Sequence, residues 1–246
     1  MSVPRVLVHA ITAADRIVSI PEADAHHLLR VLRLKAGDDI RVFDGRGREW
    51  TGQLTGSGVS SLGVEIAAEI EPVPESAVPV TIAVGLLPRD QMDSVIRDAI
   101  MLGAAAIVPM VTSRVAVPER AWRSGGAITR WRRVAMASVK QCGRAVVPRI
   151  DAVTPFETLL HLATGSALIM CVEPGLEAVT VDAAHALMPP PTSALVLIGP
   201  EGGWTDEERA AATAAGATAI HLGPRTLRAE TVPTVVLSAL WTKWGW

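Results

Sequence analysis

The chain is poor in aromatic residues and cysteine: it has no tyrosine, two phenylalanines and two cysteines, Cys142 and Cys171. Two cysteines are too few for a disulfide framework. Neither belongs to a Cys-x-x-Cys pair or a Cys/His cluster, which are the usual sequence signs of a metal site. We therefore expect two reduced thiols and no metal. The scarcity of aromatic residues beside abundant alanine and valine indicates a GC-rich coding bias and carries no functional meaning.

Long apolar segments are also missing. No stretch of about 18 uncharged apolar residues is free of Gly and Pro, which argues against a membrane span. The first residues, MSVPRVLVHA, lack the apolar core and cleavage site of a signal peptide. We therefore expect a cytoplasmic protein. With 246 residues, 49% of them hydrophobic and 20% charged, the chain has the composition of one large folded domain or two modest ones.

Charge is unevenly distributed, although the formal net charge is only −2. Residues 114–149 contain nine Lys or Arg and a single acid, Glu119, whereas residues 150–222 contain nine acids and a single base, Arg209. A basic block of this kind suits contacts with nucleic-acid phosphates. A solvated helix face accounts for the same block equally well.

The first seventy residues indicate a small β-rich barrel or sandwich. Alternating apolar and polar residues predict five strands, at 4–10, 16–20, 39–47, 49–56 and 63–70, with a hairpin turn at Asp44-Gly45 and one helix over 23–32. The proline-containing segment EPVPESAVPV, residues 71–80, has the composition of a linker. We place the first domain at 1–72 and the second at 77–246.

Strands and helices alternate after the linker, which predicts an α/β domain with a mostly parallel sheet. Strands are expected at 80–87, 105–111, 167–173, 195–199 and 219–223, and helices at 89–102, 128–142, 205–215 and 230–243. Thr205 and Glu208 form the sequence pattern of a capping box. Pro233 is tolerated in the first turn of the last helix.

Three strand ends of this domain run into unusual turns, at 171–175, 197–208 and 222–233. Ligands of α/β sheets bind beyond the carboxyl ends of strands, and glycines there permit close approach of the backbone. The turn GPEGG lacks the Gly-Lys-Ser/Thr ending of a P-loop and does not fit GxGxxG, so nucleotide phosphates are not expected. Alone, such a glycine turn is more often purely structural. Arg225 and Arg228, close to a helix start, suit an anion, or else Arg228 pairs with Glu230 at the surface.

The segments LIGPEGGWTDEE and LGPRTLRAETVP together resemble the signature of the SPOUT superfamily of knotted methyltransferases. Within it, the chain resembles the bacterial family that methylates N3 of a uridine in small-subunit (16S) ribosomal RNA. HHLLRVLRLKAGDDIRVFDGRG (26–47) is similar to that family's PUA-like RNA-binding barrel, and RWRRVAMASVKQCGRAVVPRI (130–150) to its basic helix. The helix 89–102 departs from the family pattern: Arg97 replaces a Lys, and Ile100-Met101-Leu102-Gly103 replaces Thr-Glu-Leu-Gly.

The resemblance implies S-adenosylmethionine as cofactor, held in a deep trefoil knot. The residues that match the family's cofactor site are Glu173, Ile198, Gly199, Pro200, Glu201, Gly202, Gly203, Leu222, Gly223, Leu227 and Arg228. Two of them are candidates for the chemistry. Arg228 is expected to stabilise the uridine anion, and Glu173, or a group from the other subunit, to accept the N3 proton.

The resemblance also implies ribosomal RNA of the small subunit as partner and a homodimer. RNA contacts are expected from basic residues of both domains, namely Arg30, Arg33, Lys35, Arg130, Arg132, Arg133, Lys140 and Arg144. The apolar C-terminal helix suits a dimer face but suits the core of one chain equally well. Two other functions remain open: a SPOUT ribose 2′-O-methyltransferase, which the segment 26–38 disfavours, and a non-catalytic ribosome assembly factor, which the intact GPEGG and LRAET segments disfavour. A small-molecule enzyme without an RNA partner is disfavoured by the basic block.

Overall fold

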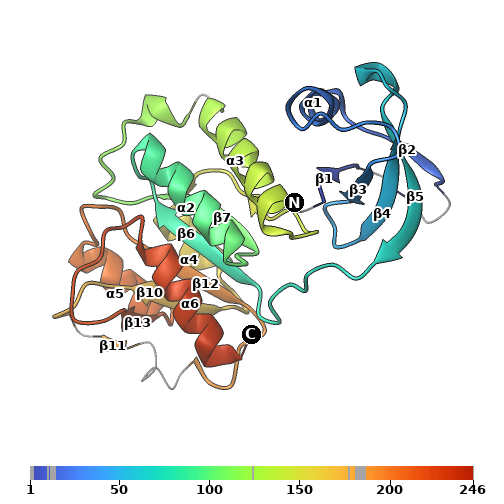
Figure 1. Ribbon diagram of the computed structural model, residues 1–246. Helices are drawn as coiled ribbons and strands as arrows, with labels where there is room; N and C mark the ends of the chain where they lie inside the picture. Colours follow the sequence, from blue (N-terminus) through green and yellow to red (C-terminus); the bar gives the residue numbers. More distant parts are fainter. Residues whose placement is uncertain are drawn as a thin grey trace. The chain divides into compact units, whose positions relative to one another are not determined.

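The structure is a computed structural model that describes residues 3–9, 11, 15–123, 125–176, 178–180 and 187–245. The chain forms two compact units, drawn in Figure 1. The first consists of Met1–Glu75 and Val139–Val147, and the second of Ser76–Ser138 and Pro148–Trp246. The first unit thus includes a segment from far along the chain. None of the described helices combines the length and apolar composition needed to cross a membrane.

The first unit contains a five-stranded sheet, in which the strand order is β1-β3-β4-β5-β2. The strands are β1 (Arg5–Leu7), β2 (Ile17–Ser19), β3 (Asp39–Phe43), β4 (Glu49–Thr55) and β5 (Gly63–Ile70), with a 3-10 turn η2 (Val59–Ser61) before β5. Only the β1–β3 pair is parallel. Its inward side chains, among them Trp50, Leu54 and Val64, form a buried core. The five predicted strands are confirmed, and their single sheet corresponds to the barrel-like alternative rather than to a two-sheet sandwich.

The predicted hairpin turn joins β3 to β4. One carboxylate oxygen of Asp44 accepts hydrogen bonds from the backbone N–H of Arg46 at 2.7 Å and of Arg48 at 3.1 Å. Gly45 has a φ of 77°, a conformation that glycine adopts without steric cost. Asp44 and Gly45 therefore set this turn by the mechanism that the sequence suggested.

The helical segment of the first unit is less regular than predicted. The helix α1 (Glu22–His26) continues as a π-helical turn, η1 (His27–Val31), and Arg33 follows with a φ of 57°. The predicted helical segment over 23–32 is confirmed, and its second half is a π-helical turn. Apolar spacing does not distinguish a helix from a π turn, because the difference lies in one shifted backbone hydrogen bond per turn.

The second unit is built on a parallel sheet with the strand order β11-β13-β10-β12-β6-β7-β8, and β9 pairs with β7. The bounds are β6 (Val80–Gly85), β7 (Ala106–Val111), β8 (Arg149–Ile150), β9 (Thr154–Pro155), β10 (Ala167–Cys171), β11 (Val179–Thr180), β12 (Ala194–Ile198) and β13 (Thr218–His221). All five residues of β12 are buried, as expected for a strand with helices on both faces. The predicted parallel α/β architecture is confirmed; the short strands β9 and β11 were not predicted.

The helices of this unit are α2 (Arg89–Met101), α3 (Gly126–Cys142), α4 (Phe156–Leu162), α5 (Asp206–Ala214) and α6 (Val232–Trp244), with a 3-10 turn η3 (Glu119–Ala121). On α2, Met92, Val95, Ile96 and Ala99 are buried, so the predicted apolar face is confirmed. The α5 capping box is also confirmed: the Glu208 N–H donates to Thr205 Oγ1 at 3.1 Å, and the Thr205 N–H donates to Glu208 Oε2 at 2.9 Å.

The helix predictions need two corrections. α6 begins at Val232 rather than at 230, because Thr231 occupies its N-cap position. α4 was not predicted at all; with only seven residues, it offers too short an apolar pattern to recognise. α6 packs beside α2, as Figure 1 shows.

The strand order fixes where a ligand can bind. β10 lies between β12 and β13 and is parallel to both. The carboxyl ends of these three strands therefore meet at one edge of the sheet. After β12 the chain forms α5 and then β13, which lies on the other side of β10. This edge carries the three unusual turns identified in the sequence.

Candidate functional site

A pocket of about 310 Å³ opens where the three turns converge. Each turn contributes to its wall: Cys171, Val172, Glu173 and Pro174 after β10; Ile198, Gly199, Pro200, Glu201, Gly203 and Trp204 after β12; and Leu222, Arg225, Thr226, Leu227, Arg228, Ala229, Glu230 and Val232 after β13. This volume lies within the range of small-molecule sites. Apolar side chains and backbone dominate the wall, and a few charged groups lie among them.

Trp204 holds the first two turns together. Its indole N–H donates to the carbonyl oxygen of Cys171 at 2.8 Å, and its ring lies 5.4 Å from that of Phe156 between centroids. A Cβ at Gly199 would lie 3.1 Å from the Trp204 ring, so this turn has little room for a larger residue. The tryptophan is 6% exposed. It therefore fixes the separation of two walls of the pocket.

Close approach of backbone also brings β6 to the site. A Cβ at Gly85, the last residue of β6, would lie 2.6 Å from the backbone nitrogen of Pro200. Gln91, in the first turn of α2, donates from Nε2 to Glu201 Oε1 at 2.8 Å. The β6–α2 connection thus supports the GPEGG turn from outside. Neither contact could be predicted from the sequence, because nothing in either segment indicates which distant turn it will touch.

The third turn presents two arginines and a carboxylate. The Arg228 side chain is 83% exposed, and its Nη1 lies 3.8 Å from Glu230 Oε1, a loose form of the surface pair considered from the sequence. Glu230 is largely buried, and its second oxygen, Oε2, has no hydrogen-bond partner among the described residues. This unpaired oxygen is itself buried, although Glu230 belongs to the wall of the pocket. From the sequence, Glu230 was expected only as a helix start and as a surface partner of Arg228.

The thiol of Cys171 lies in the wall of the pocket. Burial raises the pKa of Cys171 to about 12, so the thiol stays protonated near neutral pH and is not a nucleophile. Among the described residues, no cluster of three or more His, Cys, Asp or Glu is placed to hold a metal ion. The chemistry available to this site is therefore binding, orientation and transfer of a proton or another small group, without a thiolate.

The pocket brings together most of the residues predicted to bind the cofactor. Glu173, Ile198, Gly199, Pro200, Glu201, Gly203, Leu222, Leu227 and Arg228 line it. Gly202 and Gly223 do not: the carbonyl of Gly202 accepts a hydrogen bond from Arg114 Nη1 at 3.1 Å, and that of Gly223 lies 3.2 Å from His221 Nδ1. The rest of the wall was not among the predicted cofactor residues and consists of Cys171, Val172, Pro174, Trp204, Arg225, Thr226, Ala229, Glu230 and Val232.

The basic residues predicted to contact RNA fall into two groups. Arg30, Arg33 and Lys35 are exposed in the first unit, and Arg132 and Arg133 are exposed on α3. Arg130, Lys140 and Arg144 instead have carboxylate partners, which are Asp93, Asp24 and Glu75 respectively. The Arg144 side chain is only 7% exposed. For these three residues, at least part of the positive charge is used inside the fold.

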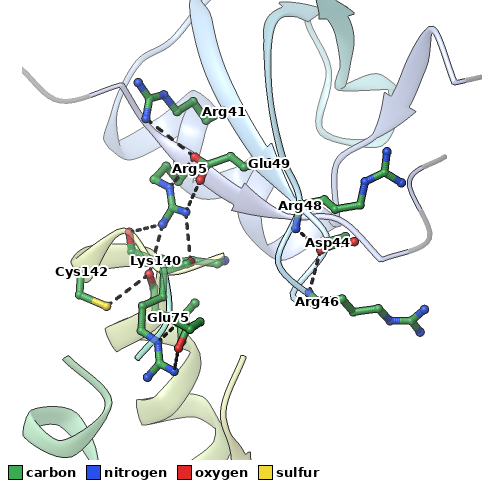
Figure 2. Close-up of polar contacts among 11 residues, drawn as sticks. Arg5, Arg41, Asp44, Arg46, Arg48, Glu49, Glu75, Lys140 and Cys142 are labelled. Atoms are coloured by element: carbon green, nitrogen blue, oxygen red, sulfur yellow. Dashed lines mark hydrogen bonds and ion pairs between the residues drawn. The ribbon is translucent and has the colours of Figure 1, made fainter. Parts of the chain in front are cut away.

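Figure 2 shows the polar cluster of the first unit around Arg5 and Glu49. Arg5 donates to both carboxylate oxygens of Glu49, at 2.9 and 2.8 Å, and to the backbone carbonyls of Val139 and Arg144, at 3.2 and 3.1 Å. Its guanidinium lies 4.8 Å from the centre of the Phe43 ring. This cluster secures the segment 139–147 to the sheet. The cluster could not be predicted from the sequence, because its members are far apart along the chain.

Comparison with known proteins gives matches over nearly the whole chain. Residues 20–67 match the RNA methyltransferase PUA domain family, and residues 74–241 match the RNA methyltransferase domain family. A protein named Ribosomal RNA small subunit methyltransferase E, from Synechocystis sp., is 33% identical, with 92% of this chain and 73% of that protein covered. A Bacillus subtilis protein of the same name is 31% identical, with 90% and 88% covered.

The solved structures agree with the sequence matches. A Ribosomal RNA small subunit methyltransferase E from Neisseria gonorrhoeae, bound to S-adenosyl methionine, superposes with a TM-score of 0.86 at 29% identity. The superposition covers 99% of this chain and 98% of that one. Both units of the fold therefore have counterparts in one relative.

Proposed function

The chain belongs to the RNA methyltransferase family that includes the ribosomal RNA small subunit methyltransferases E, and from this we propose its reaction. It transfers a methyl group from S-adenosylmethionine to N3 of a specific uridine in 16S ribosomal RNA. The observation that carries the proposal is the pocket at the ends of β10, β12 and β13. It is formed by the same GPEGG and LRAET segments on which the resemblance rests.

The residues of the pocket fit S-adenosylmethionine. An adenine ring needs an apolar slot with backbone hydrogen-bonding groups at its edge, and Ile198, Leu222 and Leu227 stand beside glycine turns in this wall. Glu173 supplies a carboxylate for a cationic or hydroxyl group of the ligand. The predicted set of cofactor residues, including Gly202 and Gly223 as backbone members of the turns, is retained as part of the proposal.

We further propose that the three turns form a deep trefoil knot. We also propose two functional domains: a PUA-like RNA-binding domain at 1–72 and the methyltransferase domain at 77–246. The strand order supports a knot. After β12, the chain crosses β10 to form β13 on its other side. The segment that leads to β13 therefore passes the connection between β10 and β12, as a knot requires. The family ranges 20–67 and 74–241 support the two domains.

The cofactor supplies an activated sulfonium methyl group, so the protein has to align the uridine and deal with its N3 proton. Arg228 lies beside the pocket with a largely exposed guanidinium, where it can stabilise negative charge on the uridine oxygens. Glu173 accepts the proton in this proposal. The neutral Cys171 thiol leaves no nucleophile for a covalent route through the base.

In this proposal, RNA is held by exposed basic side chains of both units: Arg30, Arg33 and Lys35 in the first, and Arg132 and Arg133 in the second. Arg130, Lys140 and Arg144 are retained as predicted contacts. Phosphate contacts of this kind position the RNA without reading its sequence. We also propose a homodimer in the cytoplasm, where ribosomal RNA is found. The dimer is proposed from the family resemblance, because the exposed residues of α6, Ser238 and Thr242, are polar.

One experiment tests the reaction directly. The protein is incubated with methyl-labelled S-adenosylmethionine and small ribosomal subunits from a strain that lacks the enzyme, and the RNA is digested to nucleosides. Label is expected in 3-methyluridine. Label in a 2′-O-methylated nucleoside would assign the protein to the ribose methyltransferases, and no label in RNA from any assembly state would support a non-catalytic assembly factor.

A further inference from the structure

A second hollow in the methyltransferase unit has no role in the proposed chemistry. It has a volume of about 680 Å³ and lies between the β6–α2 connection, the segment around η3 and the start of α3. Its wall consists of Leu86, Leu87, Arg89, Val117, Ala121, Trp122, Gly126, Ala127, Thr129, Arg130, Trp131 and Arg133. Three arginines and two tryptophans thus face one cavity, and no acidic residue lines it.

The charges of this hollow are only partly neutralised. Arg130 Nε lies 3.4 Å from Asp93 Oδ1, and the Arg130 side chain is 19% exposed. Arg89 and Arg133 are exposed, and within the described part of the chain neither side chain has a hydrogen-bond or ion-pair partner. The N-terminal ends of two helices, α2 at Arg89 and α3 at Gly126, also lie on this wall. Unpaired arginines beside helix N-termini suit an anion such as phosphate.

The tryptophans give the hollow an aromatic surface as well. Trp122 is half-buried, so part of its ring is available to a ligand. Trp131 is 3% exposed, and its indole N–H has no hydrogen-bond partner in the described structure. A buried donor without a partner is unusual in a folded protein and points to a missing acceptor. Arginines interleaved with an accessible aromatic ring are typical of sites for unpaired nucleotides.

The hollow adjoins the proposed cofactor pocket through a single stretch of chain. Gly85 contacts Pro200 closely and Gln91 bonds Glu201, and both partners line the cofactor pocket. The residues between them, Leu86, Leu87 and Arg89, line the hollow. An extended residue spans at most about 3.6 Å, so the few residues between Gly85 and Gln91 keep the two cavities close together. The two cavities therefore suit neighbouring nucleotides of one RNA strand rather than distant parts of an RNA.

We propose that this hollow binds an unpaired nucleotide of the RNA strand next to the methylated uridine. Its base stacks on Trp122, and its phosphates are held by Arg89 and Arg133. The inference rests on the proposed function in so far as the ligand is RNA. It adds a specific subsite, and with it a requirement that the RNA strand be single-stranded on one side of the target.

The test uses the full-length protein and a fluorescein-labelled, single-stranded oligouridylate of nine nucleotides, with affinity measured by fluorescence anisotropy at several salt concentrations. Trp122→Ala is expected to weaken binding about 5- to 150-fold, as for the loss of one stacked base, without changing the salt dependence. Trp122→Phe is expected to keep most of the affinity. Arg133→Ala is expected to lower the slope of log affinity against log salt by about 0.7, the value for one phosphate on a single strand.

Arg149→Ala is the matched control for Arg133→Ala. Both arginines belong to the basic block and are exposed, but Arg149 does not line the hollow and lies 3.6 Å from Asp151. Its removal is expected to leave the salt slope unchanged. Equal slopes for the two arginine variants, or wild-type affinity in Trp122→Ala, would overturn the proposal. If Trp122→Ala lowers the melting temperature, Trp122→Phe and the two arginine variants decide the question.

Failure of this inference is distinguishable from failure of the proposed function. If the wild type forms 3-methyluridine while the variants bind RNA normally, the subsite is wrong and the function stands. If no methyl transfer occurs but Trp122→Ala weakens RNA binding, the subsite stands and the reaction is wrong. A shift from dimer to monomer in sedimentation of Trp122→Ala, with unchanged RNA affinity, would assign the hollow to a contact between two copies.

Discussion

Arg5 and Glu49 form a two-pronged ion pair that is almost completely buried, with Nε and Nη2 of the arginine 2.9 and 2.8 Å from the two carboxylate oxygens. The side chains are 10% and 3% exposed. The same guanidinium donates to the Val139 and Arg144 carbonyls. A buried carboxylate is tolerated only when such partners compensate for its lost hydration. Arg5 therefore connects the sheet of the first unit to the segment 139–147 (Figure 2).

Removing one member of this pair should destabilise the protein strongly. Arg5→Ala leaves the Glu49 carboxylate buried without its main partner, and a cost of about 3–5 kcal/mol in the free energy of unfolding is expected. Urea denaturation followed by circular dichroism measures the change. The control is Glu69→Gln, which breaks the Arg48–Glu69 pair of the same sheet. Those side chains are 44% and 45% exposed, so little change in the urea midpoint is expected. Equal midpoints for Arg5→Ala and wild type would contradict the structural role of Arg5.

Trp204→Phe tests whether the indole hydrogen bond organises the pocket. The change leaves the Cys171 carbonyl oxygen without its 2.8 Å donor, at a cost of about 1–3 kcal/mol, and loosens the turns around the cofactor. Calorimetry should show weaker binding of S-adenosylmethionine. Trp244→Phe is the matched control: its indole N–H donates to the Leu187 carbonyl at 3.0 Å, and it does not line the pocket. This control should lose stability but keep its affinity for the cofactor. Unchanged cofactor affinity in Trp204→Phe would show that the indole hydrogen bond does not organise the pocket.

Gly85→Ala tests the contact between β6 and the GPEGG turn. The added methyl would lie 2.6 Å from the backbone nitrogen of Pro200, so the turn has to move. A displacement of about 1 Å at a reacting centre can cost on the order of 100-fold in rate, and a fall of that size in kcat/KM is expected. Gly216→Ala serves as the control. Gly216 has a φ of 86° and open space around its Cβ position, so strain lowers stability there while kcat/KM stays near wild type.

The sequence revealed those parts of the fold and site that depend on local patterns. The apolar face of α2, the capping box of Thr205 and Glu208 and the hairpin at Asp44 are all specified within a few residues. The three turns could be recognised because each directly follows a strand that the sequence predicts. Their convergence followed from the rule that parallel strands end at one edge of a sheet.

The features that the sequence did not reveal are contacts between distant residues. Arg5 bonds Glu49 and Arg144, which lie 44 and 139 positions away. Arg144 and Lys140 were predicted as RNA contacts, and the sequence could not show that Glu75 and Asp24 are their ion-pair partners in the fold. Charge patterning shows where cations are concentrated. It does not show which of them are neutralised by acids from another part of the chain.

The buried thiol of Cys171 predicts a specific alkaline sensitivity. Burial raises the pKa of this thiol from 9.0 to about 12, so between these values only the unfolded chain loses the proton. The folded state then binds more protons than the unfolded state, and stability falls as pH rises. A loss of about 1.4 kcal/mol between pH 8 and pH 10 is expected in urea denaturation without cofactor. Cys171→Ala should abolish this loss and Cys142→Ala should not. The chain has no tyrosine to ionise in the same range.

Arg228→Ala separates catalysis from cofactor binding. The guanidinium is 83% exposed, and its carboxylate partner among the described residues, Glu230 Oε1, lies 3.8 Å away, so the side chain is available to a developing anion on the uridine. Loss of one such donor typically costs about 100- to 1000-fold in turnover. Methyl transfer to small subunits should fall by that factor, while calorimetry gives a cofactor affinity near that of the wild type. Arg225→Ala, which removes another exposed arginine of the same turn, should keep most of the turnover. If cofactor affinity falls in parallel with turnover in Arg228→Ala, the arginine binds the cofactor and another group stabilises the anion.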